Sequence, residues 1–202
     1  AQVQTQIDNR QLVQAEGGQV VMTARAASSL IGSSINNSGI VTASSLSSQG
    51  GRVSLTANHV ANTGTLSADG TQGGHVVIAA TQHDAFGVVS ATGAQTTGGS
   101  IEIDAQRTVM LQNASMRADG ATDGGQVRMT HGQTGTGGAY LSGTLSADGA
   151  NGHGGDVQIT GRQLDLFGTR ISATGTTGGG QLRVGGDYQG ANAAVPNADT
   201  LD

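Results

Sequence analysis

Three aspartates that occupy the same place in a repeated phrase are the first candidates for chemistry. Asp69, Asp119 and Asp148 each follow an alanine and precede a glycine. Carboxylates aligned on successive units could bind calcium or act as the acids of a glycoside hydrolase. A structural role is simpler, because aspartate accepts hydrogen bonds from backbone N–H groups in turns and glycine tolerates positive φ. Thr92 and Thr174 replace the aspartate in other units, which argues against a shared catalytic requirement.

Neither the histidines nor the serines are spaced like a metal site or a nucleophilic site. No two histidines are separated by three residues, the spacing of paired zinc ligands on a helix. The stretch 152–159 resembles a calcium-binding nonapeptide, but it occurs once, and a calcium roll needs tandem copies. No Gly-x-Ser-x-Gly elbow is present. We therefore expect no catalytic residue, metal or cofactor, and we expect solvated turn positions for His59, His75, His83, His131 and His153.

The composition excludes several classes of protein. The chain has 202 residues, 35 glycines, 2% aromatic residues and a formal net charge of -5. The scattered acidic residues offer no basic footprint, so no nucleic-acid partner is expected. All nine basic residues are arginine, which excludes lysine chemistry such as Schiff-base formation. The absence of cysteine excludes disulfides and thiolate metal sites.

The distribution of apolar residues predicts neither a membrane span nor a signal peptide. No stretch approaches the roughly 20 apolar residues of a membrane helix. The first residues lack a charged segment followed by an apolar one. A chain without cysteine suits export in an unfolded state. We expect a chain that is not inserted in a membrane and is either mature or excised from a longer protein.

The elements that must position these residues follow from a repeat in which a Gly-Gly pair precedes two apolar positions at period two. The pairs begin at Gly17 and recur every 23 to 33 residues as far as Gly179. Period-two apolar residues predict a strand with one buried face. The two predicted core rows are Val20, Val53, Val76, Ile101, Val127, Val157, Leu182 and Met22, Leu55, Ile78, Ile103, Met129, Ile159, Val184. Between the rows, Glu102 and Arg128 are predicted to stack outward as an ion pair on successive coils.

A second phrase closes each unit and predicts a second strand. Gly64–Gly70 recurs as Gly87–Gly93, Ala114–Gly120 and Gly143–Gly149. Its predicted inward rows are Leu66, Val89, Met116, Leu145, Ile171 and Ala68, Ala91, Ala118, Ala147, Ala173, with alanine at a narrow corner. A unit with one apolar face must stack on its neighbours. The sequence therefore predicts an all-β, right-handed parallel β-helix of roughly seven coils, about 35 Å long at ~4.8 Å per coil.

These phrases resemble the repeats of filamentous-haemagglutinin-like adhesins of the two-partner secretion family. Ile35–Ala43 and Val60–Ala68 resemble the family's Asn-Ser-Gly-Ile phrase, and Gly185–Gly190 with Pro196–Ala198 resembles a phrase of its long members. The resemblance covers nearly the whole chain. One departure is the absence of an Asn-Pro-Asn-Gly motif, so the resemblance places the segment downstream of the amino-terminal secretion domain or trimmed from it.

The resemblance implies a non-enzymatic segment of a secreted or surface-attached bacterial adhesin. Its expected partners are an outer-membrane two-partner-secretion pore during export and a host or biofilm polysaccharide, and its expected roles are attachment, aggregation, biofilm formation and virulence. Residues 1–186 are predicted to form the β-helix, and residues 187–202 a tail or the start of a further coil. Insertions at residues 26–35 and 131–138, and the tail, are expected to bulge onto the surface.

The outward row of the second strand is the candidate ligand-binding face. Hydroxyl groups with two guanidinium groups could hydrogen-bond along an extended polysaccharide, and arginine favours acidic sugars through bidentate contacts. Serine and threonine at these positions also simply suit a solvated β-face. The candidate residues are Thr65, Ser67, Ser90, Arg117, Thr144, Ser146, Arg170 and Ser172, in a row with Ser115.

Two other functions are compatible with a β-helix. A polysaccharide-processing enzyme would need acidic residues that converge in one groove, and the chain has few aromatic residues and only two glutamates. An ice-binding solenoid would need a broad, flat and uncharged hydroxyl face. Arg117 and Arg170 interrupt the predicted ranks, which disfavours ice binding.

Overall fold

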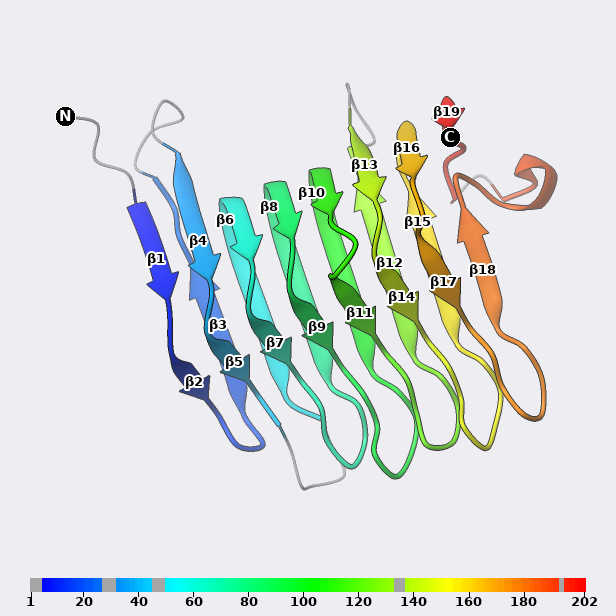
Figure 1. The fold of residues 1–202 in the computed structure, drawn as a ribbon, viewed down its shortest axis with the longest axis horizontal. Helices are drawn as coiled ribbons and strands as arrows, with labels where there is room; N and C mark the ends of the chain where they lie inside the picture. Colours follow the sequence, from blue (N-terminus) through cyan, green and yellow to red (C-terminus); the bar gives the residue numbers. More distant parts are fainter. Residues whose placement is uncertain (1–4, 27–31, 45–49, 133–136, 193–194) are drawn as a thin grey trace.

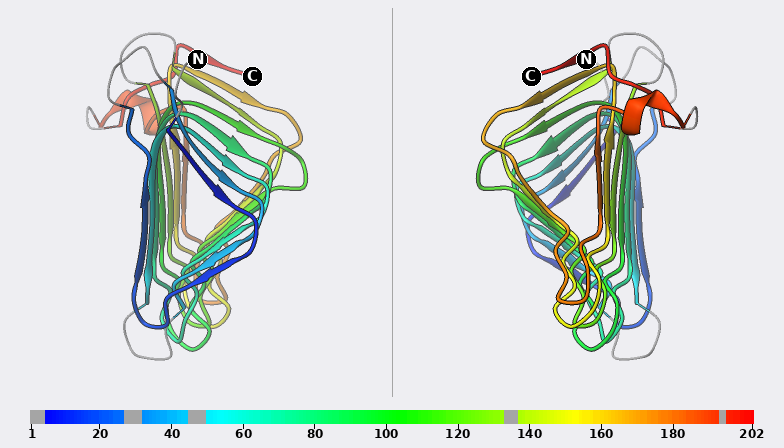
Figure 2. Two further views of the ribbon diagram at one scale, coloured as in Figure 1. Left: turned by 90° about the vertical axis from the view of Figure 1, so that its left-hand side faces the viewer. Right: turned by 90° about the vertical axis from the view of Figure 1, so that its right-hand side faces the viewer.

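The computed structural model describes residues 5–26, 32–44, 50–132, 137–192 and 195–202, and it is a parallel β-solenoid of about six turns. Successive coils lie side by side along one axis (Figure 1). Viewed from the end that holds the N-terminus, the chain turns clockwise as it recedes, so the solenoid is right-handed (Figure 2). The predicted fold class is confirmed, and the number of coils is close to the predicted seven.

Each coil has three faces. The first face carries β3 (Gln19–Thr23), β12 (Gln126–His131), β15 (Asp156–Thr160) and β18 (Gln181–Val184). The second carries β1 (Thr5–Asn9), β4 (Ser33–Asn37), β13 (Gly138–Leu141), β16 (Gln163–Leu166) and β19 (Thr200–Leu201). Three long strands bend from the first face onto the second: β6 (Arg52–Asn62), β8 (His75–Ala85) and β10 (Ser100–Met110).

The third face is a separate seven-stranded sheet, to which the chain adds one strand each time it passes this face. Its strands are β2 (Leu12–Gln14), β5 (Ile40–Thr42), β7 (Thr65–Ser67), β9 (Val88–Ser90), β11 (Ser115–Arg117), β14 (Thr144–Ser146) and β17 (Arg170–Ser172). A short 3-10 helix, η1 (Tyr188–Gly190), follows β18. In the described part of the chain no helix is long and apolar enough to span a bilayer.

The predicted strand register is confirmed along the first face. Val127 pairs with Ile101 on one side and Val157 on the other, and all three are fully buried. Glu102 pairs with Arg128 on the outward side, as predicted. The predicted ion pair between them is wrong, because none joins these two described side chains in the structure. Leu182, in the last coil, is 52% exposed because no coil covers it on one side.

The first and third faces converge on a narrow corner built from alanine and the Gly-Gly pairs. Ala68, Ala91, Ala118 and Ala147 are fully buried there. The second glycine of a pair donates its N–H to the alanine carbonyl of its own coil, as Gly99 does to Ala91 at 2.7 Å. A Cβ on Gly99 would overlap the carbonyl oxygen of Gly74 in the preceding coil. Only glycine fits where backbones approach so closely.

A buried asparagine ladder fills the corner between the second and third faces in the first coils. The side-chain amide of Asn9 donates to Asn37 at 2.8 Å, and that of Asn37 donates to Asn62 at 2.8 Å. The next coil ends the ladder, where Asn62 donates to the carbonyl of Val88 at 3.2 Å. Each amide has a partner on the next coil, so the ladder satisfies buried polar groups that would otherwise be costly.

The insertions differ in part from the prediction. Residues 27–31 and 133–136 lie outside the described residues. Ile35 is not part of a surface insertion, because it lies in β4 and is fully buried. In the tail, β19 pairs in parallel with β16. The division of the chain at residue 186 remains a prediction.

Candidate ligand-binding face

The predicted hydroxyl residues share the outward side of the third face. Strand pairing aligns them in two rows, because alternate residues of each strand point the same way. One row is Thr65, Val88, Ser115, Thr144 and Arg170, and the other is Ser67, Ser90, Arg117, Ser146 and Ser172. We call these two rows the hydroxyl strip.

Three serines of the hydroxyl strip are covered by other parts of the protein, although they lie on the outward side of the sheet. Ser67, Ser90 and Ser146 are only 9%, 8% and 6% exposed. The hydroxyls of Ser67 and Ser90 both donate to the carboxylate of Asp69, at 2.8 and 2.5 Å. The groups of the strip most available to a ligand are therefore the two exposed arginines and three half-buried hydroxyl residues, Thr65, Ser115 and Thr144.

The aspartates of the repeated phrase hold successive coils together. Asp69 accepts the backbone N–H of Thr92 at 2.6 Å and its hydroxyl at 2.8 Å. Asp148 accepts the same two groups of Thr174, at 2.6 and 2.9 Å. The predicted structural role of these aspartates agrees with this geometry. The backbone N–H groups they accept belong to the next coil rather than to their own turn.

The charge of Asp148 is stabilised by these contacts. Burial alone would raise the pKa of this carboxyl, but hydrogen bonds from Ser172 and Thr174, with Arg170 nearby, outweigh it and lower the pKa from 3.8. A carboxylate that accepts several hydrogen bonds favours its ionised form. Asp148 therefore remains a charged acceptor in neutral solution.

A shallow groove runs beside the strip at the turns of three coils. Arg117, Asp119, Asp148 and Thr174 line it together with backbone glycines. Arg117 bonds Asp119 at 3.0 Å, and Asp119 also accepts the backbone N–H of Asp148 at 2.9 Å. The acidic side chains in this groove are thus occupied by bonds within the protein. Such an arrangement differs from the free acid and base of a glycosidase.

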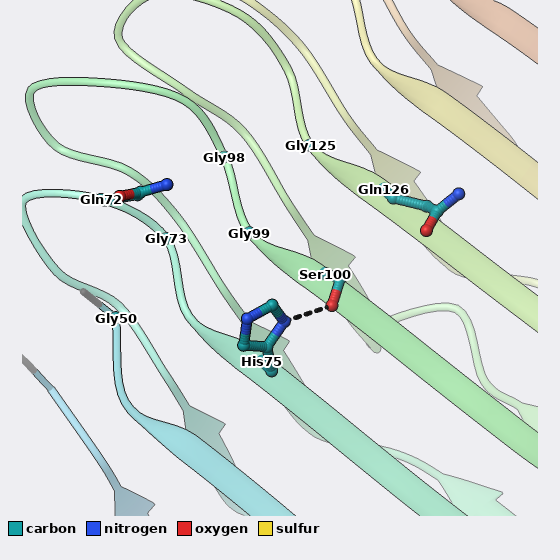
Figure 3. A pocket seen from close by; sticks show the side chains of 9 residues that line it. All are labelled: Gly50, Gln72, Gly73, His75, Gly98, Gly99, Ser100, Gly125 and Gln126. Atoms are coloured by element: carbon teal, nitrogen blue, oxygen red, sulfur yellow. Dashed lines mark hydrogen bonds between the residues drawn. The ribbon is translucent and has the colours of Figure 1, made fainter. Parts of the chain in front are cut away.

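A second hollow lies on the first face beside the Gly-Gly pairs (Figure 3). His75 points into it and its Nδ1 lies 2.7 Å from the hydroxyl of Ser100 on the next coil. Backbone glycines and two glutamines make up the rest of its wall. Among the described residues, no group of three or more His, Cys, Asp or Glu side chains is arranged to hold a metal ion.

Only His153 is an exposed residue outside the named strands, as predicted; His59 and His75 lie in β6 and β8, and the other two histidines are not solvated at all. His83 and His131 are fully buried in the interior. His83 follows Val76 by seven residues, the same offset that separates Val60 from Val53 and Thr108 from Ile101, and strand pairing aligns these three second-face positions. This fixed offset is the sequence signal that would have placed His83 inside.

Burial shifts the proton equilibria of both rings. Loss of solvent, with the His131 charge as the second cause, lowers the pKa of His83 from 6.5 to about 4. Loss of solvent also lowers the pKa of His131 to about 4, against an opposing hydrogen bond to the carbonyl of Thr160. Both rings are therefore neutral in the folded protein near pH 7.

The buried rings predict a loss of stability in mild acid. Between pH 6.5 and about 4 the unfolded chain binds protons that the folded protein excludes, so stability falls as the pH is lowered through this window. We expect the melting temperature at pH 4.5 to lie about 5 °C or more below that at pH 7.5. The His83→Leu variant should show a smaller fall. An identical pH profile in the variant would contradict this assignment.

The fold resembles that of one solved secretion domain. A scan against protein-family models gave no match, and a search of curated proteins gave none either. Among solved structures, the HMW1 secretion domain from Haemophilus influenzae is similar, with a TM-score of 0.73 and 21% sequence identity over 88% of this chain. The match covers 55% of that chain, so the present chain spans about half its length. The likeness establishes a shared β-solenoid fold.

Proposed function

We propose that this chain is a non-enzymatic segment of a secreted adhesin of the filamentous-haemagglutinin type, exported through an outer-membrane two-partner-secretion pore. The stacking of the repeated phrase into two parallel sheets that run through the described coils carries the proposal. The shared fold with a secretion domain supports it. So does the use of the repeated aspartates as bonds between coils, as at Asp69 and Asp148. The segment acts as a rigid shaft, since each coil is bonded to its neighbours along three faces.

A secretion experiment tests the export part of the proposal. The chain, joined to the secretion signal of an exoprotein, is produced with the matching outer-membrane pore, and the medium is assayed for folded protein. We expect release into the medium that depends on the pore. Retention in the periplasm in the presence of an active pore would contradict the proposal.

We further propose that the hydroxyl strip is the binding face for an acidic polysaccharide. Arg117 and Arg170 are exposed on the same side of the third face, and a guanidinium forms paired hydrogen bonds with a carboxylate. The mostly buried Ser67, Ser90 and Ser146 contribute less to such contacts. Each contact is weak, so affinity would come from many coils acting together.

Co-sedimentation with uronic-acid polysaccharides tests the binding face. The Arg117→Ala/Arg170→Ala variant is expected to bind about tenfold more weakly. This loss of binding free energy corresponds to roughly one charged hydrogen bond. Arg128→Ala is the matched control, because Arg128 is an exposed arginine on the first face and should leave binding unchanged. Binding that is absent, or indifferent to both strip arginines, would leave the segment as a shaft alone.

A further inference from the structure

The interior of the solenoid contains polar atoms without a partner. Both ring nitrogens of His83, the hydroxyl of Thr108 and Nε2 of His131 are buried and make no hydrogen bond. Buried polar groups in folded proteins nearly always have a protein or water partner. Four such atoms in one protein interior therefore call for an explanation.

The three side chains come from three successive coils. His83 lies in β8, Thr108 in β10 and His131 in β12. Thr108 pairs directly with His83 in the inward row of the second face. His131 closes the first face of the next coil, aligned with Ala105 in β10. All three side chains are fully buried, so they enter the same interior from three successive coils.

The hydrogen-bonding needs of the three side chains are complementary to those of water. Nδ1 of His131 lies 3.1 Å from the carbonyl of Thr160 and donates to it, so Nε2 of the neutral ring is an acceptor. Neutral His83 offers one donor and one acceptor, and the hydroxyl of Thr108 offers both. A molecule that donates and accepts in several directions satisfies this set, and water in polar interiors typically makes about three such bonds.

We propose that His83, Thr108 and His131 form an internal binding site for water in the middle coils of the solenoid. Bound water donates to Nε2 of His131 and exchanges hydrogen bonds with the ring of His83 and the hydroxyl of Thr108. The site links three coils through polar contacts within the interior, as the asparagine ladder does in the first coils. It is independent of the proposed adhesin function.

The alternative occupant is a transition-metal ion, for which two imidazoles are suitable ligands. The described residues provide no third His, Cys, Asp or Glu ligand beside them. Asp84 and His59 are the other titratable groups whose charges affect the pKa of His83. Their side chains are hydrogen-bonded to each other at 2.8 Å. Water is therefore the occupant that the side chains favour.

The direction in which one substitution changes the melting temperature distinguishes a hydrated site from a dry one. Thr108→Val keeps the shape of the side chain and removes the hydroxyl. If water bridges Thr108 to a histidine, the variant loses that bond, and we expect the melting temperature to fall by about 2–5 °C. If the hydroxyl is truly unpartnered, the methyl group removes a desolvation cost, and the melting temperature would rise, which overturns the proposal.

Direct detection of water completes the test. A high-resolution crystal structure of the chain should show solvent density within hydrogen-bond distance of Nε2 of His131 and of the Thr108 hydroxyl. A direct bond between the two imidazoles, or a dry site, would contradict the proposal.

Thermal melts with zinc, nickel and copper ions, each compared with EDTA, test for a metal. A stabilisation that EDTA reverses and His83→Leu abolishes would make the site a metal site instead.

Discussion

Val127→Asp is expected to unfold the coils on both sides of β12. Val127 is fully buried between Ile101 and Val157 in the inward row of the first face. A carboxylate there has no cationic partner, and an unpaired buried charge costs at least several kcal/mol. Because each coil contacts mainly its neighbours, the rest of the stack cannot compensate for a lost central coil. Circular dichroism should show a lost or strongly lowered melting transition.

Ser54→Asp is the matched control for this substitution. It introduces the same charge on the first face but at an outward position, between Val21 and Val77 on the neighbouring coils. We expect its melting temperature to stay within about 2 °C of the wild type, because surface substitutions are usually nearly neutral. If Val127→Asp melted equally close to the wild type, the inward assignment of Val127 would be wrong.

The register of the first and third faces could be predicted from the sequence because each inward position holds the same kind of residue, either large and apolar or alanine, in every coil. A one-residue slip would turn the buried Val76 and Ile78 of β8 outward, so the apolar rows specify the register strongly. The alanine row locates the narrow corner in the same way, since no larger side chain occurs there in any coil. The repeat presents each position several times within one chain, and comparison of these copies shows which residues face inward.

The second face was missed because its inward row is chemically mixed. From Ile35 the aligned positions continue through Val60, His83, Thr108 and Ala139, so no period-two apolar signal marks the strand. The bend in the long strands also breaks the alternation between the two faces. A histidine in such a row is read as a surface residue unless its offset from the preceding core row is counted.

The sequence predicted which residues of the hydroxyl strip share a row, but not which groups of the protein their side chains bond to. Strand pairing alone places Ser67, Ser90 and Arg117 in one row. Whether a serine faces solvent or bonds an aspartate depends on the path of the turn that follows the strand. That path carries Asp69 back over the third face, where Ser90 of the next coil reaches it. A contact between turns of different coils has no signature in the spacing within one repeat.

Asp69 and Asp148 also explain why a threonine can take the place of aspartate on the next coil, as Thr92 follows Asp69 and Thr174 follows Asp148. The carboxylate of one coil accepts the N–H and the hydroxyl of the threonine that follows on the next coil. A threonine in that place is therefore the complement of the aspartate, not a loss of it. These hydrogen bonds between coils account for both residue types at this position. Stacking of the coils is therefore sufficient to explain them, without a reaction on a substrate.

Gly98→Ala is expected to disrupt the stacking of its coil on the next. A Cβ at Gly98 would overlap the carbonyl oxygen of Ala118 and lie 2.6 Å from the backbone nitrogen of Gly125. Both neighbours are backbone atoms of the next coil and cannot move without breaking its hydrogen bonds. Overpacking in a core costs about 1–3 kcal/mol or more, so we expect the melting temperature to fall by about 5–10 °C.

Gly179→Ala tests whether the neighbouring coil causes that loss. Gly179 holds the same place in its Gly-Gly pair as Gly98, but in the last pair of the repeat, and its Cβ would come no closer than 3.9 Å to the carbonyl oxygen of Ala173. The same substitution should therefore change the melting temperature by less than about 2 °C. Equal losses in the two variants would trace the requirement for glycine to the conformation of the turn itself. A loss confined to Gly98→Ala would trace it to the close approach of successive coils.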